Sequence, residues 1–201
     1  YLLNLVLKPR KKPYTNTLYV MPETATVKIK KPNEIERMDK NLSQIKTEIY
    51  DKCSFEISDF KTESEGTEYN ACQYKLNGLN ILCRNAKITP KKVGQFVTCW
   101  KRNKSGITEP YSENDHIDFY VVIARTENKF GQFVFPKSTL IKKGIMSTEK
   151  KDGKRGFRVY PKWDVAKNKQ AERTQKWQLD YFYEIDDSTD LQRVNELYNS
   201  K

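Results

Sequence analysis

The strongest constraint on the fold is a central segment, residues 69–160, in which short β-prone runs alternate with turn signals. Two runs, 95–100 and 117–124, are apolar at both odd and even positions, which places them in the middle of the fold. Asn77-Gly78 separates two other runs by the two residues that favour a tight hairpin. We expect strands at residues 69–76, 79–88, 95–102, 117–125, 131–136 and 157–160.

Helical periodicity flanks this segment on both sides. Asn33 is placed to cap a first helix, with Glu36 at capping-box spacing. Apolar residues then recur at spacings of three and four, at Ile35, Met38, Leu42, Ile45 and Ile49. After Trp163 a second helix is predicted to about Glu184, with one face marked by Ala171, Thr174, Trp177, Tyr181, Phe182 and Ile185. Thr189 with Gln192 predicts the cap of a last helix.

These elements predict an α+β fold. Its core is a mixed or antiparallel sheet, or a pseudobarrel, with an N-terminal helix and C-terminal helices. Residues 1–32 are repeatedly interrupted by proline, which indicates an N-terminal arm or extension. Residues 33–201 are predicted to form a single domain, which is large enough to bury a substantial core.

The cysteines indicate neither a disulfide framework nor a zinc site. Cys53, Cys72, Cys83 and Cys99 form no CxxC pair, and the single His116 has no second metal ligand nearby. With no leader-like start and no apolar run near 20 residues, the sequence predicts reduced thiols in a cytoplasmic protein without a membrane span. We expect neither a metal nor another cofactor.

Charge is both large and segregated. The chain has 37 Lys and Arg against 26 Asp and Glu, a formal net charge of +11, which favours polyanionic partners. Acids dominate residues 48–68 and 180–196. Between them lie a first basic tract, residues 84–104, which contains no acid, and a second basic tract, residues 137–176. Nucleic acid, with DNA preferred to RNA, is the expected partner.

The second basic tract also contains a predicted contact element. Asp152-Gly153 indicates a hairpin tip, and alternation then places Lys154, Arg158 and Tyr160 on one face of the next strand. We expect nucleic acid to contact Arg84, Lys87, Lys91, Lys92, Lys101, Arg102, Lys154, Arg155, Arg158, Tyr160, Lys162, Trp163, Gln170, Arg173 and Gln175. The alternative is a solvated surface in which Arg84 and Arg158 pair with the acidic segments.

Several segments resemble the MepB-like family: RNAKITPKKVGQFV (84–97), GQFVFPK (131–137) and GKRGFRVYPKWD (153–164). The resemblance extends over about residues 65–185 and implies a bacterial, cytosolic protein. The family name is associated with a staphylococcal multidrug-efflux gene cluster, and it carries no settled biochemical activity. The family more remotely resembles DNA-binding pseudobarrel folds, which adds an analogy in favour of nucleic-acid binding.

Function is therefore expected to be nucleic-acid binding with little sequence specificity, in an accessory role, and not catalysis. No nucleotide-binding, zinc-protease or serine-hydrolase motif is present, and no catalytic residue is predicted. Two alternatives stay open. One is a protein-interaction factor of an efflux or regulatory system. The other is a metal-dependent nuclease, with carboxylates from Glu63, Glu65, Glu68, Asp115 and Asp118 and a lysine from Lys87 or Lys154.

Overall fold

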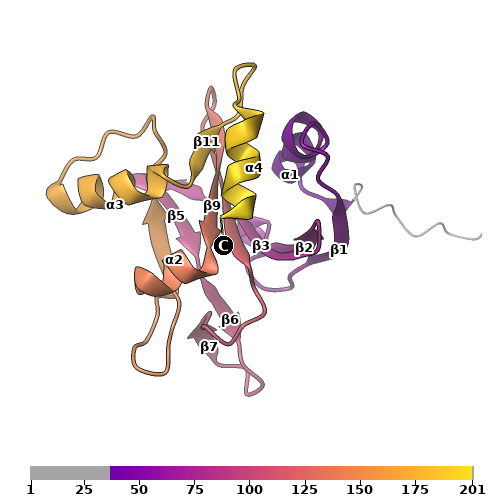
Figure 1. Ribbon diagram of the computed structural model, residues 1–201. Helices are drawn as coiled ribbons and strands as arrows, with labels where there is room; N and C mark the ends of the chain where they lie inside the picture. The colour runs from indigo at the N-terminus through magenta and orange to yellow at the C-terminus, as the bar shows by residue number, and fades with distance from the viewer. Residues whose placement is uncertain (1–36, 201) are drawn as a thin grey trace, which may run out of the picture. The chain divides into compact units, whose positions relative to one another are not determined.

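The computed structural model describes residues 37–200 (Figure 1). The predicted arm, residues 1–32, and the predicted cap Asn33 lie outside the described residues. The described part is α+β, as predicted, with helices before and after a set of β-sheets.

The main sheet has six strands in the order β1-β2-β3-β8-β9-β11. It is mixed, because β3 and β8 run parallel while the other neighbours are antiparallel. Asn77 and Gly78, with φ of 48° and 83°, form the tight turn between β2 and β3, which confirms the predicted hairpin. The strands are β1 (Ile57–Thr62), β2 (Cys72–Leu76), β3 (Leu79–Asn85), β8 (Phe119–Arg125), β9 (Phe130–Pro136) and β11 (Phe182–Glu184).

A second sheet has three strands in the order β10-β5-β4, and β6 with β7 forms a separate hairpin. The predicted runs 79–88 and 95–102 are each divided, so that β3 and β4 belong to different sheets, as do β5 and β6. No sheet within residues 37–200 closes into a barrel. Of the forms predicted for the core, the structure therefore has the mixed sheet. The strands are β4 (Lys87–Thr89), β5 (Lys92–Thr98), β6 (Trp100–Arg102), β7 (Thr108–Pro110) and β10 (Gly156–Val159).

The core has two clusters, one on each face of the main sheet, and β8 contributes to both. Phe119, Val121 and Ile123 belong to the first cluster, while Tyr120 and Val122 belong to the second. This alternation explains why the run is apolar at both parities. The first cluster is covered by α1 (Lys40–Ile45), the π-helix η2 (Lys46–Tyr50) and α4 (Leu191–Asn199); the second is covered by α2 (Lys137–Lys142), α3 (Lys169–Leu179) and the second sheet.

The first helix starts later than predicted. It begins at Lys40, where the Asp39 carboxylate caps it by accepting a bond from the Asn41 N–H at 2.9 Å. Met38 therefore lies before the helix, whereas Leu42 and Ile45 are buried as predicted. A short 3₁₀ turn, η3 (Thr67–Tyr69), also replaces the predicted start of the strand before β2.

The C-terminal helices also differ from the prediction. The helix α3 ends at Leu179 and not near Glu184, because residues 182–184 instead pair with β9 as β11. The cap of α4 is Asp190, whose side chain accepts from the Arg193 N–H at 3.1 Å. Thr189, the predicted cap, instead accepts from the Asp186 N–H in the preceding turn.

The predicted hairpin tip at Asp152-Gly153 is wrong. The tight turn lies just before it, where the Thr148 N–H donates to the Lys151 carbonyl at 2.9 Å. β10 then pairs with β5, a strand far away in the sequence, because Phe157 and Val159 are buried in the second core cluster.

A buried tyrosine cluster joins the first two helical segments to the sheet and to α4. The Tyr50 hydroxyl lies 3.1 Å from that of Tyr74 and 2.8 Å from that of Tyr198. The Gln132 Oε1 atom accepts from Tyr50 at 3.2 Å, from Tyr198 at 3.1 Å and from Tyr183. One amide of β9 thus fixes hydroxyls from η2, β11 and α4.

Because these hydroxyls are buried, we expect the protein to unfold at alkaline pH. Burial raises the pKa of Tyr74, Tyr183 and Tyr198 well above the usual value near 10. Above pH 10 the unfolded chain therefore binds fewer protons than the folded chain, so the free energy of unfolding falls as pH rises. We expect the tyrosinate absorbance of the buried residues to appear together with loss of far-UV circular dichroism. Titration of all 12 tyrosines near pH 10 in a folded chain would contradict this.

The four cysteines are free thiols, three buried and Cys53 half-buried, in agreement with the prediction. Within the described residues, no helix has the length and apolar character needed to cross a membrane.

Candidate nucleic-acid interface

The two basic tracts meet at one cavity of about 540 Å³. The first tract supplies Lys91 and Lys92, at the tip of the hairpin formed by β4 and β5. The second supplies Arg158 and Tyr160 at the end of β10, and Lys167 just before α3. No acidic residue of the described chain lines the cavity, whose wall consists of Pro90, Lys91, Lys92, Val93, Arg158, Tyr160, Lys167, Asn168 and Ala171. We refer to it below as the basic cavity.

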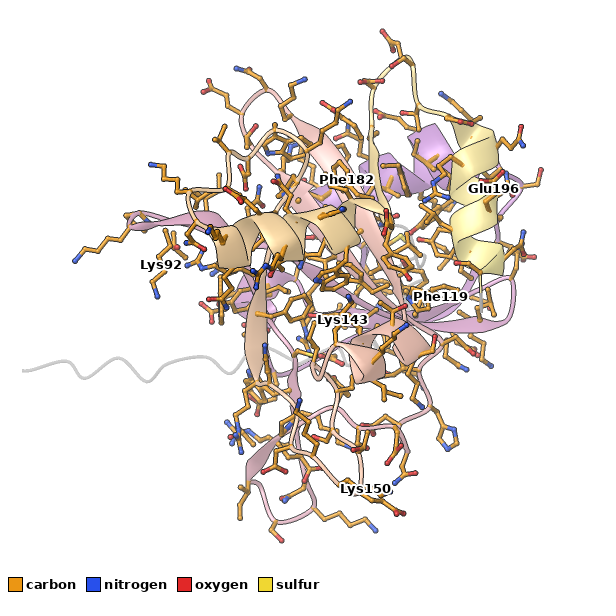
Figure 2. The ribbon with its side chains drawn as sticks, turned by 60° about the vertical axis from the view of Figure 1, so that its left-hand side comes forward. Lys92, Phe119, Lys143, Lys150, Phe182 and Glu196 are labelled. Atoms are coloured by element: carbon orange, nitrogen blue, oxygen red, sulfur yellow. The ribbon has the colours of Figure 1, made fainter. Side chains whose placement is uncertain are left out.

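The lysines of the basic cavity are exposed. Figure 2 shows Lys92 at the outer end of its hairpin, on the same side of the molecule as α3. No ion pair among residues 37–200 involves Lys91, Lys92 or Lys167. Their charges are therefore available to an anion from solution.

Arg158 connects β10 to the opposite hairpin. Its guanidinium donates to the Gly94 carbonyl at 2.8 Å and to the Thr89 Oγ1 atom at 2.6 Å. These acceptors are neutral, and no carboxylate of the described chain forms an ion pair with Arg158. The residue thus fixes the cavity wall and still contributes an uncompensated positive charge to it.

The helix α3 holds the end of β10 through the buried amide of Gln178. Its Oε1 atom accepts from the Tyr160 N–H at 2.9 Å, and its Nε2 atom donates to the Arg158 carbonyl at 2.8 Å. Asn168 caps the same helix by accepting from the Ala171 N–H at 2.9 Å. The N-terminus of α3, which favours anions, is consequently placed at the cavity.

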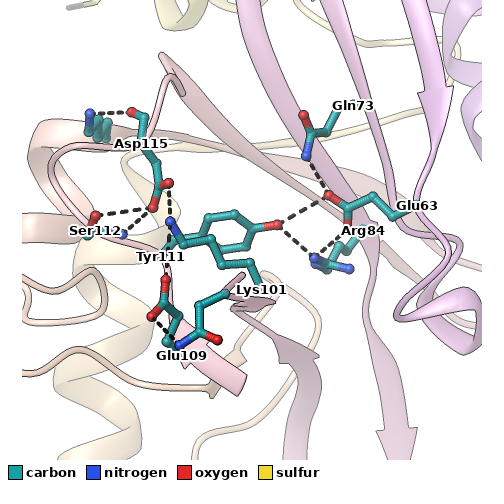
Figure 3. Close-up of polar contacts among 10 residues, drawn as sticks. Glu63, Gln73, Arg84, Lys101, Glu109, Tyr111, Ser112 and Asp115 are labelled. Atoms are coloured by element: carbon teal, nitrogen blue, oxygen red, sulfur yellow. Dashed lines mark hydrogen bonds and ion pairs between the residues drawn. The ribbon is translucent and has the colours of Figure 1, made fainter. Parts of the chain in front are cut away.

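Arg84 is a correction to the predicted interface. It is only 2% exposed, and its guanidinium donates to Glu63 at 2.6 Å and to the Tyr111 hydroxyl at 3.2 Å (Figure 3). A side chain enclosed in this way cannot reach a phosphate, so the predicted alternative of an internal ion pair holds for Arg84. Tyr111 in turn donates to the half-buried Glu63 at 3.2 Å, which closes a three-residue network around the buried Arg84.

Three other residues of the first tract also contact acids. The Lys87 Nζ atom lies 3.0 Å from Glu68, and the Arg102 Nε atom lies 2.5 Å from Glu65. Lys101 pairs with Asp115 and, at 3.5 Å, with Glu109. Figure 3 shows Lys101 with Asp115 and Glu109, and none of Lys87, Lys101 and Arg102 lines the basic cavity. Their charges are largely neutralised within the chain.

Lys154 and Arg155 are exposed at the opposite end of β10 from the basic cavity. The Arg155 guanidinium donates at 3.0 Å to the carbonyl of Thr108, the first residue of β7. Six residues of extended chain span about 20 Å, so Lys154 and Tyr160 cannot share one small binding site.

The remaining predicted residues lie in and around α3. Lys162, Gln170 and Arg173 are exposed but do not line the cavity. Trp163 is half-buried, with its ring 5.5 Å from that of Phe182, and it belongs to the core and not to the surface. Gln175 uses its amide to donate to the Pro161 and Asp164 carbonyls, so it holds the loop that precedes α3.

Lys167 and Asn168 line the cavity but were not predicted. The signal for them is the helix cap, since an asparagine three residues before a buried alanine is typical of a helix start. A basic residue directly before such a cap lies at the positive end of the helix, where anions bind.

Four of the five carboxylates named for the nuclease alternative are engaged by cations. Glu63, Glu65, Glu68 and Asp115 each form an ion pair with a lysine or arginine. In the part of the chain that the structure describes, no group of three or more His, Cys, Asp or Glu side chains is arranged to hold a metal ion.

Comparison with known proteins gives one close similarity. Residues 63–184 match the MepB-like family. The crystal structure of MepB is 36% identical in sequence, with a TM-score of 0.65 over 75% of this chain and 100% of that chain. The bacterial homing endonuclease I-Ssp6803I is 15% identical, with a TM-score of 0.36 over 72% of this chain and 84% of that chain. No curated protein matches the chain.

Proposed function

Because this chain belongs to the MepB-like family, whose name specifies no ligand, we propose a function from the basic cavity: binding of a nucleic-acid backbone with little sequence preference. DNA in the cytoplasm is the expected partner. The observation that carries the proposal is the convergence of two basic tracts, distant in sequence, on one cavity that no acidic residue among residues 37–200 lines.

The chemistry of the cavity suits phosphate. Three exposed lysines provide point charges, Arg158 adds a fixed positive charge, and the N-terminus of α3 adds a favourable dipole. Lysine contacts with phosphate do not depend on the base sequence, which supports low specificity. Their strength depends on salt, because binding releases condensed counterions.

Of the two other functions, the nuclease gains no supporting observation, since four of its candidate carboxylates are held by cations. A protein partner with an acidic surface would use the same lysines. Binding experiments can distinguish the two partners, because an acidic protein surface would not bring a regular series of phosphates to the cavity.

The proposal predicts the effect of changing Lys91, Lys92 and Lys167 together to alanine. We expect affinity for a 20-nucleotide DNA to fall by about ten- to a hundredfold at low salt. The slope of log K against log salt should become less negative by about two to three, near one for each lost phosphate contact. Fluorescence anisotropy with a labelled oligonucleotide measures both quantities.

A matched control changes Lys104, Lys142 and Lys150, which are equally exposed but do not line the cavity. Figure 2 shows Lys150 at the bottom of the view, well apart from Lys92 at the left. The control removes the same charge and should have a much smaller effect. Equal losses in the two triple variants, or no binding by the unsubstituted chain at low salt, would overturn the proposal.

A further inference from the structure

The aromatic ring of Tyr160 has a fixed position in the basic cavity. It packs directly against Gly94, where a Cβ atom would lie 2.6 Å from the Tyr160 Cε1 atom. Gly94 also has φ of +80°, a conformation that favours glycine. Because Gly94 has no side chain, the second sheet has room at this position for the Tyr160 ring.

The backbone of Tyr160 is equally constrained. Its N–H is held by Gln178, and the following Pro161 restricts its conformation to the extended region. The residue is half-buried, so part of the ring faces the cavity. A ring that is already ordered loses little conformational entropy when a second ring stacks on it.

The rest of the wall suits one nucleotide. Pro90 and Val93 provide apolar surface beside Tyr160, while Lys91, Lys92 and Lys167 surround it with positive charge. The volume of about 540 Å³ falls in the range of sites that enclose small organic molecules. Apolar surface next to an ordered aromatic ring is not needed for phosphate alone, but it is the surface on which a base stacks.

We propose that the basic cavity binds single-stranded nucleic acid, with one base stacked on Tyr160 and the flanking phosphates held by the lysines. This inference rests on the proposed function and makes it more specific. A duplex keeps its bases paired and stacked inside, so a base would enter the cavity only after it was flipped out of the helix. A single strand offers the base without that cost.

The test compares three probes of equal length on the unsubstituted chain: a labelled 20-nucleotide oligo(dT), an abasic deoxyribose-phosphate oligomer and a DNA duplex. We expect oligo(dT) to bind about five- to a hundredfold more tightly than the abasic oligomer, which has the phosphates but no bases. Equal affinity for those two probes, or tighter binding of the duplex, would overturn the inference while backbone binding still stands. No binding of any probe would overturn the proposed function itself.

Two variants then test the ring. Tyr160→Leu should reduce the ratio of oligo(dT) to abasic affinity to near one, whereas Tyr160→Phe, which keeps the ring, should preserve it. Circular dichroism shows whether each variant is folded, and the comparison of probes on the unsubstituted chain does not depend on that result. A ratio that persists in folded Tyr160→Leu would show that the bases stack elsewhere.

Discussion

Changing Arg84 to methionine is expected to lower the free energy of unfolding by about 3 kcal/mol, the low end of the range for removing one partner of a buried ion pair. Arg84 is 2% exposed, and its removal leaves the Glu63 carboxylate without its cation. The Glu63 side chain retains 16% exposure and bonds from Gln73 and Tyr111, which limits the loss. Urea unfolding followed by circular dichroism measures it.

Arg102 gives a matched control, because it forms the same kind of pair with Glu65 where both side chains are more than two-fifths exposed. Arg102→Met should cost less than about 1 kcal/mol. The double variant Glu63→Gln with Arg84→Met should recover part of the loss, since no buried charge remains. Similar costs for the two arginines would contradict the buried network, and lower DNA affinity in folded Arg84→Met would restore Arg84 to the interface.

Changing Gln132 to leucine should lower the free energy of unfolding by about 2–4 kcal/mol, because three buried tyrosine hydroxyls lose a shared acceptor. Tyr183 donates to Gln132, and Tyr50 and Tyr198 lie 3.2 and 3.1 Å from the same oxygen. The Gln132 Nε2 atom is buried and has no hydrogen-bond partner within the described part of the chain, so its removal returns a little of that energy.

A double-mutant cycle isolates the contact. Tyr183→Phe removes one of the donors, so Gln132→Leu should cost less in that background than in the unsubstituted chain. Gln192, exposed on α4 with its side-chain amide 3.3 Å from Glu196, is the control, and its change to leucine should alter the free energy of unfolding by no more than about 0.5 kcal/mol. Additive effects of the two core changes would contradict a shared hydrogen-bond network.

The fold was predictable where local chemistry and burial agree. Apolar residues at both parities of residues 117–124 predicted a central strand, and β8 is buried on both faces. Asn77-Gly78 predicted its hairpin because its conformational requirement is local. The helix predicted to about Glu184 was wrong beyond Leu179, since the apolar spacing there fits a helix equally well, and only pairing with the edge of β9 makes the strand β11 the better solution.

The candidate site was predictable in its charge but not in its selection of residues. Segregated basic tracts identified Lys91, Lys92, Arg158 and Tyr160, all of which line the cavity. The sequence could not show that Arg84 contacts Glu63, because that pair depends on how distant strands come together. Burial of Trp163 against Phe182 is a tertiary contact of the same kind.

The two bonds from Gln178 to β10 also have a consequence for solubility. β10 is at the edge of the second sheet, where unpaired backbone groups can recruit a strand from another molecule. The Arg158 carbonyl and the Tyr160 N–H are two such groups, and the Gln178 amide binds both, as a neighbouring strand would. A side chain of α3 therefore protects this edge against intermolecular β-pairing and the aggregation that follows from it.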